Sequence, residues 1–441
     1  YGYPMGLADY SAFILGGLPK QGQTLEEVKD LLLNEIKKLR AGEFDEKMLQ
    51  ANINNFKLYE LQSMESNEGR ADIFVNSFIN GTNWEDEVTA IDRMAKLTKE
   101  DIVAFADKYL KEDNYAVVYK KQGKDPNEKK MTKPEITPIV SNRDVASPFL
   151  TSIQENTVKP IEPVFLDFKK DMSQLTAKSD IPVLYKQNTT NDLFQLIYVF
   201  DMGNNNDKAL GTAFDYLEYL GTSDMTPEEL KSEFYRLACT FYVSPGNERT
   251  YVVLSGLNEN MPAAMQLFEK LLADAQVNKE AYNNLVGDIL KARADAKLNQ
   301  GQNFSRLMNY AMYGPKSPAT NLLTEAELAS MNPQELVDRI HNQNNYKHRI
   351  LYYGPSSSKD LLATIDQYHQ VPATLKDIPA GNEFSYLETP ATKVLVAPYE
   401  AKQIYMAQIS NLDKKYDPAI EPTRELYNEY FGELHRLPGN A

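Results

Sequence analysis

One segment of this chain of 441 residues occurs twice, and the duplication restricts the possible folds more than any single motif does. The first copy, LTKEDIVAFADKYLKEDNYAVVYKK, begins at Leu97, and the second, MNPQELVDRIHNQNNYKHRILYYGP, begins at Met331. The copies align without a gap, so that Tyr119 and Tyr353 stand at the same place. Each copy reads as an amphipathic helix followed by a strand, and we expect both to belong to larger repeated units.

The repeat extends toward the amino-terminal side of each copy. An apolar strand is expected at residues 9–19 and its counterpart at residues 251–258. The helix that follows the first strand has a capping box formed by Thr24 and Glu27, and Gly42 marks its end. The other expected helices are one from about residue 45, a further one before residue 97, and those at 97–110, 261–275, 278–298 and 304–313.

A second kind of segment precedes this unit. Residues 181–203 read as a hairpin of two strands that leads into a helix, and residues 393–410 read the same way and lead into the helical PTRELYNEYFG. We name the hairpin with its helix the A half-module, and the strand, helices and repeated segment the B half-module. The chain then has the order B, linker, A, B, A. We expect a piece of a longer protein, because the first B lacks an A and the last A is incomplete.

The linker between the first B and the first A is rich in proline, which favours an extended path over a surface. It covers residues 122–178. Its apolar residues are expected to be buried against neighbouring parts of the protein. These residues are Ile136, Phe149, Ile161, Val164 and Phe165.

Composition restricts the kinds of partner. The formal net charge is −15 and the isoelectric point is near 4.9. An acidic surface repels the phosphate backbone, so no nucleic-acid partner is expected. No apolar run reaches the length of a membrane-spanning helix, and no membrane span is expected. The single cysteine, Cys239, excludes an intrachain disulfide, and its apolar neighbours predict a small buried residue rather than a reactive thiol.

Few residues could carry chemistry. The sequence contains no glycine-rich phosphate loop and no G-x-S-x-G nucleophile elbow. None of the histidines pairs with another at the i, i+4 spacing that places two imidazoles on one helix face for zinc. The four are His341, His348, His369 and His435, and we interpret the first three as surface residues or helix C-caps. Close acidic pairs in EELKSE and TEAELAS, and the basic residues of KARADAK, read as solvated helix faces.

Residues 210–244, LGTAFDYLEYLGTSDMTPEELKSEFYRLACTFYVS, have the outline of a catalytic helix without its reactive groups. An apolar stripe ends at Leu-Gly-Thr, and a second amphipathic helix then leads into a strand. The chain resembles the insulinase/pitrilysin family of zinc metallopeptidases. The resemblance rests on this outline, on the order of the half-modules, on the strings LEYLGT, LSGL and ILYYGP, and on the linker KPEITPIVSNRDVASPF.

In that family the corresponding helix carries H-x-x-E-H shortly before a Gly-Thr. The two histidines bind zinc, and the glutamate activates the metal-bound water. Counted back from Gly221 and Thr222, the two histidine positions here hold Thr212 and Tyr216, and the glutamate position holds Asp215. The resemblance therefore implies the matching helix of a non-catalytic copy, kept for packing.

The resemblance also implies the fold and its division into domains. The fold class is α+β, with repeated two-layer αβ domains of the insulinase/pitrilysin (LuxS/metallohydrolase-like) type, in which a mostly antiparallel sheet packs on helices. The implied parts are the carboxy-terminal part of the second αβ domain at 1–121, the inter-half linker at 122–178, the third αβ domain at 179–372, a connector at 373–390 and the start of the fourth αβ domain at 391–441.

The implied function is that of a fragment of a zinc-dependent endopeptidase that cleaves unstructured peptides in a chamber between two halves. This chain would be the non-catalytic part, with no catalytic or metal-binding residue of its own and with unknown binding residues. Zinc would be held by the missing amino-terminal half, and the chain alone is expected to cleave nothing. Two alternatives remain, a non-catalytic paralogue that serves as partner subunit or scaffold, and a binding module of αβ repeats.

Two further expectations come from the resemblance. Bacterial relatives with this kind of linker are exported, so the periplasm or cell envelope is the expected compartment. The tail ELHRLPGNA at 433–441 departs from the family's pattern, and we attribute it to a frameshift in the source sequence. His435 is then expected to carry no function.

Overall fold

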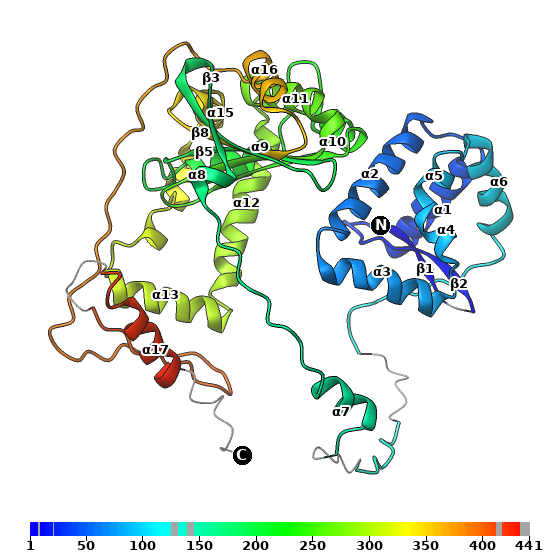
Figure 1. The fold of residues 1–441 in the computed structure, drawn as a ribbon, viewed down its shortest axis with the longest axis horizontal. Helices are drawn as coiled ribbons and strands as arrows, with labels where there is room; N and C mark the ends of the chain where they lie inside the picture. The colour runs from blue at the N-terminus through cyan, green and yellow to red at the C-terminus, as the bar shows by residue number, and fades with distance from the viewer. Residues whose placement is uncertain (8, 21, 125–130, 139–144, 412–416, 433–441) are drawn as a thin grey trace. The chain divides into compact units, whose positions relative to one another are not determined.

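The computed structural model describes residues 1–7, 9–20, 22–124, 131–138, 145–411 and 417–432 (Figure 1). The chain forms two compact units, the first made of residues 1–53 and 63–173 and the second of residues 54–62 and 174–441. None of the helices in the described ranges is both long and apolar enough to cross a lipid bilayer. Residues 433–441, the tail for which we expect a frameshift, lie outside the described residues, and so does His435.

The first unit begins with two strands and continues with helices. β1 (Gly2–Gly6), which the sequence did not predict, pairs antiparallel with the predicted β2 (Ser11–Leu15). α1 (Leu25–Arg40) starts at the predicted capping box, in which Glu27 N donates to Thr24 Oγ1 at 3.1 Å and Thr24 N donates to Glu27 Oε2 at 2.7 Å. The helices that follow in the chain are α2 (Lys47–Ser63), of which residues 54–62 are assigned to the second unit, α3 (Asn67–Asn80), α4 (Trp84–Val88), α5 (Ala90–Met94) and α6 (Lys99–Tyr109).

The strand expected at the end of the first repeated segment does not form. Residues 114–121 are irregular, whereas the equivalent segment of the second unit is β8 (Arg349–Gly354). The difference lies in the available partners. β8 has a strand on each side, while β1 and β2, the strands in the described part of the first unit, pair with each other. A strand without a neighbour leaves its backbone groups without partners.

The segment before the second unit contains α7 (Pro148–Gln154) and α8 (Phe168–Asp171). The prediction that its apolar side chains are buried was wrong. The exposed fractions are 71% for Ile136, 76% for Phe149, 96% for Ile161, 90% for Val164 and 85% for Phe165. Apart from Phe149, which lies in α7, these residues belong to no helix or strand.

A six-stranded sheet forms the centre of the second unit, with the strand order β3-β4-β8-β5-β7-β6. β4 pairs parallel with β8, whereas β5 pairs antiparallel with β8 and β7, and β6 pairs antiparallel with β7. The sheet is therefore mostly antiparallel, as predicted. Its strands, besides β8, are β3 (Ser173–Ala177), β4 (Ile181–Gln187), β5 (Leu193–Phe200), β6 (Cys239–Pro245) and β7 (Thr250–Leu257).

The predicted hairpin at 181–203 is wrong in its pairing. Both strands form, but β8 lies between them, and residues Val183 and Gln195 each face β8 rather than each other. The apolar side chains of Ile350 and Tyr352 make β8 suitable for the middle of the sheet, since 0% and 3% of their surfaces are exposed. The short sequence separation of β4 and β5 favours a hairpin between them, but burying the apolar β8 places it between the two strands.

Helices cover the sheet of the second unit in the predicted sequence order (Figure 1). α9 and α10 contact β6, α11 contacts β6 and β7, and α15 and α16 pack on α11. The predicted helices at 261–275, 278–298 and 304–313 are confirmed. The bounds are α9 (Leu210–Leu217), α10 (Pro227–Arg236), α11 (Met261–Asp274), α12 (Lys279–Ala296), α13 (Gln300–Tyr313), α14 (Glu325–Ser330), α15 (Gln334–Asn342) and α16 (Ser358–Tyr368).

The hairpin predicted at 393–410 is absent, since these residues contain no strand, while the helix expected after it is present as α17 (Glu421–Gly432). The sequence pattern alternates as a strand would, but no partner strand lies beside it in the described structure. The predicted fold class, α+β with a mostly antiparallel sheet packed on helices, is confirmed. The predicted domain boundaries stay predictions.

Candidate functional site

α9 carries Thr212, Asp215 and Tyr216, the three positions that the sequence analysis singled out. Tyr216 is completely buried, Thr212 is half-buried and Asp215 is exposed. The Tyr216 hydroxyl donates to the carbonyl oxygen of Asn278 at 2.6 Å and accepts from its backbone N–H at 2.8 Å. Asn278 is the N-cap of α12, so Tyr216 fixes the start of that helix against α9.

The ring of Tyr216 packs edge-on against Tyr282, with the ring centroids 5.8 Å apart. Burial raises the pKa of the Tyr216 phenol. The side chain is therefore neutral and has its hydroxyl fully used by the backbone of α12. In the described part of the chain, no group of three or more His, Cys, Asp and Glu side chains is arranged to hold a metal ion.

Two of the histidines that the sequence analysis interpreted as surface residues or helix C-caps are buried. His369 is the C-cap of α16, as one of these alternatives had it, but neither His369 nor His348 lies on the surface. His348 is 7% exposed and His369 is 0% exposed. Their Nε2 atoms lie 2.9 Å apart and share a hydrogen bond. His341 lies in the last turn of α15 as expected, where its Nε2 is 3.1 Å from the Ala275 carbonyl oxygen. His348 directly precedes β8 and His369 directly follows α16, a helix that packs on α11.

Glu269 on α11 is the centre of the polar cluster that buries both histidines. Its side chain is completely buried and receives His369 Nδ1 at 2.6 Å. Tyr198 Oη donates to Glu269 Oε1 at 2.9 Å, and Asn344 Nδ2 and the backbone N–H of Gln370 each donate to Oε2 at 3.0 Å. Four donors thus satisfy one carboxyl group inside the core, as buried acidic groups require.

Hydrogen-bond geometry fixes the number of protons in this cluster. His348 Nδ1 lies 2.7 Å from the carbonyl oxygen of Tyr346, which can only accept, so Nδ1 carries a proton. One further proton lies between the two Nε2 atoms, and a third lies between His369 Nδ1 and Glu269. Two neutral imidazoles supply two protons, and the third cancels the charge of the carboxylate. The cluster is therefore neutral overall, which suits its burial.

The same geometry makes His348 a poor base and the cluster a poor metal site. Burial, and then the neighbouring His369, lower the pKa of His348 to about 4. Burial and the Glu269 carboxyl raise the pKa of Tyr198 well above its usual range. A zinc ion needs about 2 Å to each nitrogen and an open lone pair on each, whereas the Nε2 atoms here bond to each other. The cluster holds α11, β5, β8 and α16 together.

Sequence reasoning missed Glu269, although a signal was present. In α11 the buried side chains of Met265, Phe268 and Leu272 form an apolar stripe at helical spacing, and Glu269 falls inside that stripe. An acidic residue on the buried face of a helix requires buried partners. Which histidines supply them cannot be read from the sequence, since His369 lies on another helix.

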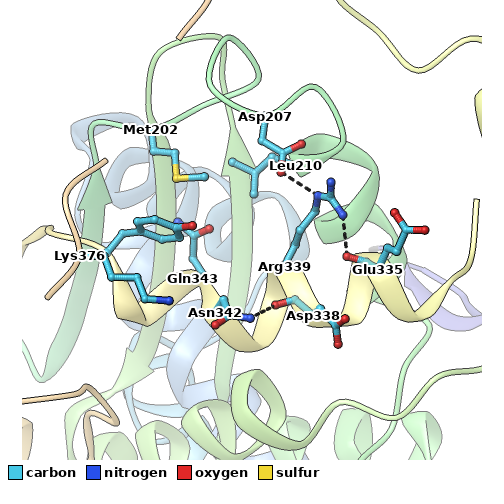
Figure 2. A pocket seen from close by; sticks show the side chains of 10 residues that line it. Met202, Asp207, Leu210, Glu335, Asp338, Arg339, Asn342, Gln343 and Lys376 are labelled. Atoms are coloured by element: carbon cyan, nitrogen blue, oxygen red, sulfur yellow. Dashed lines mark hydrogen bonds and ion pairs between the residues drawn. The ribbon is translucent and has the colours of Figure 1, made fainter. Parts of the chain in front are cut away.

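An open pocket of about 350 Å³ lies beside α15 (Figure 2). Met202 and Leu210 form its apolar wall, and residues of α15 form its polar wall. The Arg339 guanidinium crosses the pocket to Asp207, with Nε 2.7 Å from Oδ2, and Nη1 donates to the Glu335 carbonyl oxygen at 2.7 Å. The size is at the lower end of small-molecule pockets.

Gln343 is the unusual residue of this pocket. It belongs to the short 3-10 helix η4 (Gln343–Asn345), is 1% exposed, and lines the cavity. Among the described residues, neither its Nε2 nor its Oε1 has a hydrogen-bond partner. Figure 2 shows its amide on the side of the pocket where Met202 and Leu210 lie. A buried carboxamide without partners is rare and points to a group that enters from the pocket.

Cys239 lies at the start of β6 and is 5% exposed, so the predicted buried core cysteine is confirmed. Burial raises the pKa of its thiol to about 12. The thiolate, which is the nucleophilic form, is therefore scarce at neutral pH.

No protein-family model matches the chain, and no curated protein matches it by sequence. The solved structures similar to it include the periplasmic protease PqqL from Escherichia coli, with 14% identity over 84% of this chain and 41% of that chain and a TM-score of 0.45. They also include a peptidase M16 inactive domain from Pseudomonas fluorescens, with 15% identity over 49% of this chain and 53% of that chain and a TM-score of 0.40. A protease from Helicobacter pylori has 11% identity over 49% of this chain and 54% of that chain, with a TM-score of 0.39. The chain thus spans less than two thirds of each of these proteins.

Proposed function

We propose that this chain is a non-catalytic part of a zinc metallopeptidase system of the insulinase/pitrilysin type, in which it helps to bind unstructured peptides. The observation that carries the proposal is Tyr216. It occupies the position of a zinc-binding imidazole in the resembling helix, yet its ring is buried and its hydroxyl is used by Asn278 on both sides. The helix serves packing where a catalytic copy would serve metal binding.

The zinc ligands and the catalytic base of the system lie, in this proposal, on another polypeptide segment. Thr212 stands at the other histidine position and supplies no imidazole, and Asp215 stands at the glutamate position. The zinc would polarise the scissile carbonyl and lower the pKa of a bound water there. This chain would contribute peptide-binding surface and the frame on which the halves assemble.

The test is to purify the chain as it is, measure its zinc content by elemental analysis, and follow cleavage of a quenched fluorescent peptide with and without a zinc chelator. We expect less than one zinc in ten chains and no chelator-sensitive cleavage. One zinc per chain together with cleavage that the chelator abolishes would overturn the proposal. The matched control is Tyr216→Phe, which removes the hydroxyl and should leave both readings unchanged.

Genomic DNA around this sequence distinguishes the two forms of the proposal. An H-x-x-E-H segment in the same reading frame indicates a single-chain peptidase. The same motif in a neighbouring gene indicates a partner subunit, and co-purification of the two products then measures the assembly. A genome without either arrangement would favour a binding module that acts without a peptidase.

A further inference from the structure

The pocket beside α15 has the features of a binding site rather than of a packing defect. Three acidic and two basic side chains line it, and the Asp207–Arg339 ion pair accounts for one of each sign. The remaining charges are separated. Figure 2 shows Lys376 at one end of the pocket and Glu335 and Asp338 at the other. The ends therefore attract groups of opposite sign.

Gln343 lies between the charged ends, and its amide offers a donor and an acceptor in one plane. The N–H and C=O groups of one residue in an extended chain present a donor and an acceptor on the same edge, which is the pairing used between antiparallel strands. The Gln343 amide is complementary to that edge. Both amide atoms are closed to solvent in this structure, so a ligand with a peptide group in the middle would satisfy them after the Gln343 side chain turns toward it.

We infer that this pocket binds a short extended peptide with free termini, whose ammonium end lies at Glu335 and Asp338, whose carboxylate end lies at Lys376, and whose backbone pairs with Gln343. The choice of a peptide rests in part on the proposed function, in which cleavage products of this kind are present. The backbone near Lys376 is held in place, since its N–H donates to Asn345 O at 2.8 Å and its C=O accepts from Lys347 N at 2.9 Å.

The first experiment measures binding of the tripeptide Ala-Ala-Ala to the full chain by isothermal titration calorimetry. Gln343→Leu should weaken binding at least tenfold, because an apolar side chain of similar length cannot pair with the peptide group. Its melting temperature should stay the same or rise, since the substitution removes an unpaired buried amide. Gln367→Leu, at an exposed position of α16, is the matched control and should leave binding unchanged.

The second experiment assigns the ends. Carboxy-terminal amidation of the tripeptide should weaken binding to the wild-type chain about fivefold or more, and should have no further effect on Lys376→Gln. Amino-terminal acetylation should behave in the same way with Asp338→Asn. Matched losses of this kind show that each charged group of the ligand meets the named side chain, as in a double-mutant cycle.

Several results would overturn the inference. They are an absence of binding at millimolar tripeptide, equal binding to Gln343→Leu, and equal effects of amidation on wild type and Lys376→Gln. If the tripeptide does not bind and the melting temperature of Gln343→Leu equals that of the wild type, ordered water alone fills the pocket. These measurements do not depend on zinc content or cleavage, so the two proposals can fail separately. A chain that proved catalytic could still bind the tripeptide in this pocket, and a chain that proved non-catalytic could fail to bind it.

Discussion

Acidification should destabilise the second unit through His348. In the folded chain, burial beside Tyr198 and Phe200, and then charge repulsion from His369, lower the pKa of His348 from its ordinary 6.5 to about 4. The unfolded chain takes up a proton on this residue below about pH 6.5, while the folded chain does so only near pH 4. The stabilising effect of His348 is therefore complete above pH 6.5 and is lost as the pH falls toward 4.

The magnitude follows from the two pKa values. A shift of about 2.5 units corresponds to about 3 kcal/mol in full, and about 2 kcal/mol of it is lost between pH 8 and pH 5. The groups that face His348 are the His369 ring, the Tyr346 carbonyl and, beyond His369, the Glu269 carboxyl. All of them are internal to the cluster, so salt should change the effect little.

The assay should read the second unit alone. Trp84, the single tryptophan, lies in the first unit, so its fluorescence during urea unfolding reports that unit and serves as an internal control. Hydrogen exchange of the backbone amides of β5, β7 and β8, corrected for the pH dependence of the intrinsic rates, reports the opening free energy of the second unit. Protonation of His348 should make the opening free energy of the wild type about 2 kcal/mol lower at pH 5 than at pH 8.

The variant His348→Gln isolates the effect. Its amide oxygen can accept from His369, but it cannot also donate to Tyr346, so the variant should be about 1–3 kcal/mol less stable at pH 8. The difference between wild type and variant should shrink by about 2 kcal/mol at pH 5. Wild-type and variant curves that run parallel between pH 5 and pH 8 would refute the reasoning. The Trp84 signal should be the same in both proteins.

Three further substitutions follow from the same structure. Glu269→Leu leaves Tyr198 and His369 buried without their acceptor and should cost about 3–5 kcal/mol, measured by the same hydrogen exchange; an effect below 1 kcal/mol would contradict a buried, fully paired carboxyl. Tyr216→Phe removes the two bonds to the α12 N-cap and should cost about 1–3 kcal/mol, with increased exchange at the start of α12. Gly256→Ala should destabilise β7 by about 1–3 kcal/mol or prevent folding. The φ of Gly256 is +149°, and a Cβ there would lie 2.3 Å from the carbonyl oxygen of Ala238, so a fully stable variant would refute the clash.

The helices could be predicted from the sequence because their signals are local. Thr24 and Glu27 define the start of α1 within four residues of sequence, and the Asn278 cap does the same for α12. Apolar periodicity sets the face that each helix buries. The register on α9 was likewise local, since counting back from Gly221 gave the position of Tyr216. None of these inferences needed a contact from elsewhere in the chain.

The strand order and the polar cluster could not be predicted, because both depend on distant residues. β4 and β5 read as a hairpin, and only the placement of β8, far along the chain, separates them. The burial of His348 and His369 could not be predicted, since His369 bonds to Glu269 on another helix and His348 bonds to His369. The same dependence explains why residues 114–121 look like a strand yet form none. A pattern shows that a segment could pair, but not whether a partner exists.

The polar cluster and the pocket are consequences of one short element. In η4, Asn344 turns toward α11 and donates to Glu269, and Gln343, one residue earlier, faces the pocket instead. Consecutive residues of a 3-10 helix point about a third of a turn apart, so the two side chains cannot share the Glu269 carboxyl. Packing alone would be better served by leucine at 343, since the site is buried beside Met202 and Leu210 and the amide has no partner there. The cluster explains why Gln343 points away from the core, but it does not explain why that residue is an amide, and a ligand with a peptide group supplies that missing reason.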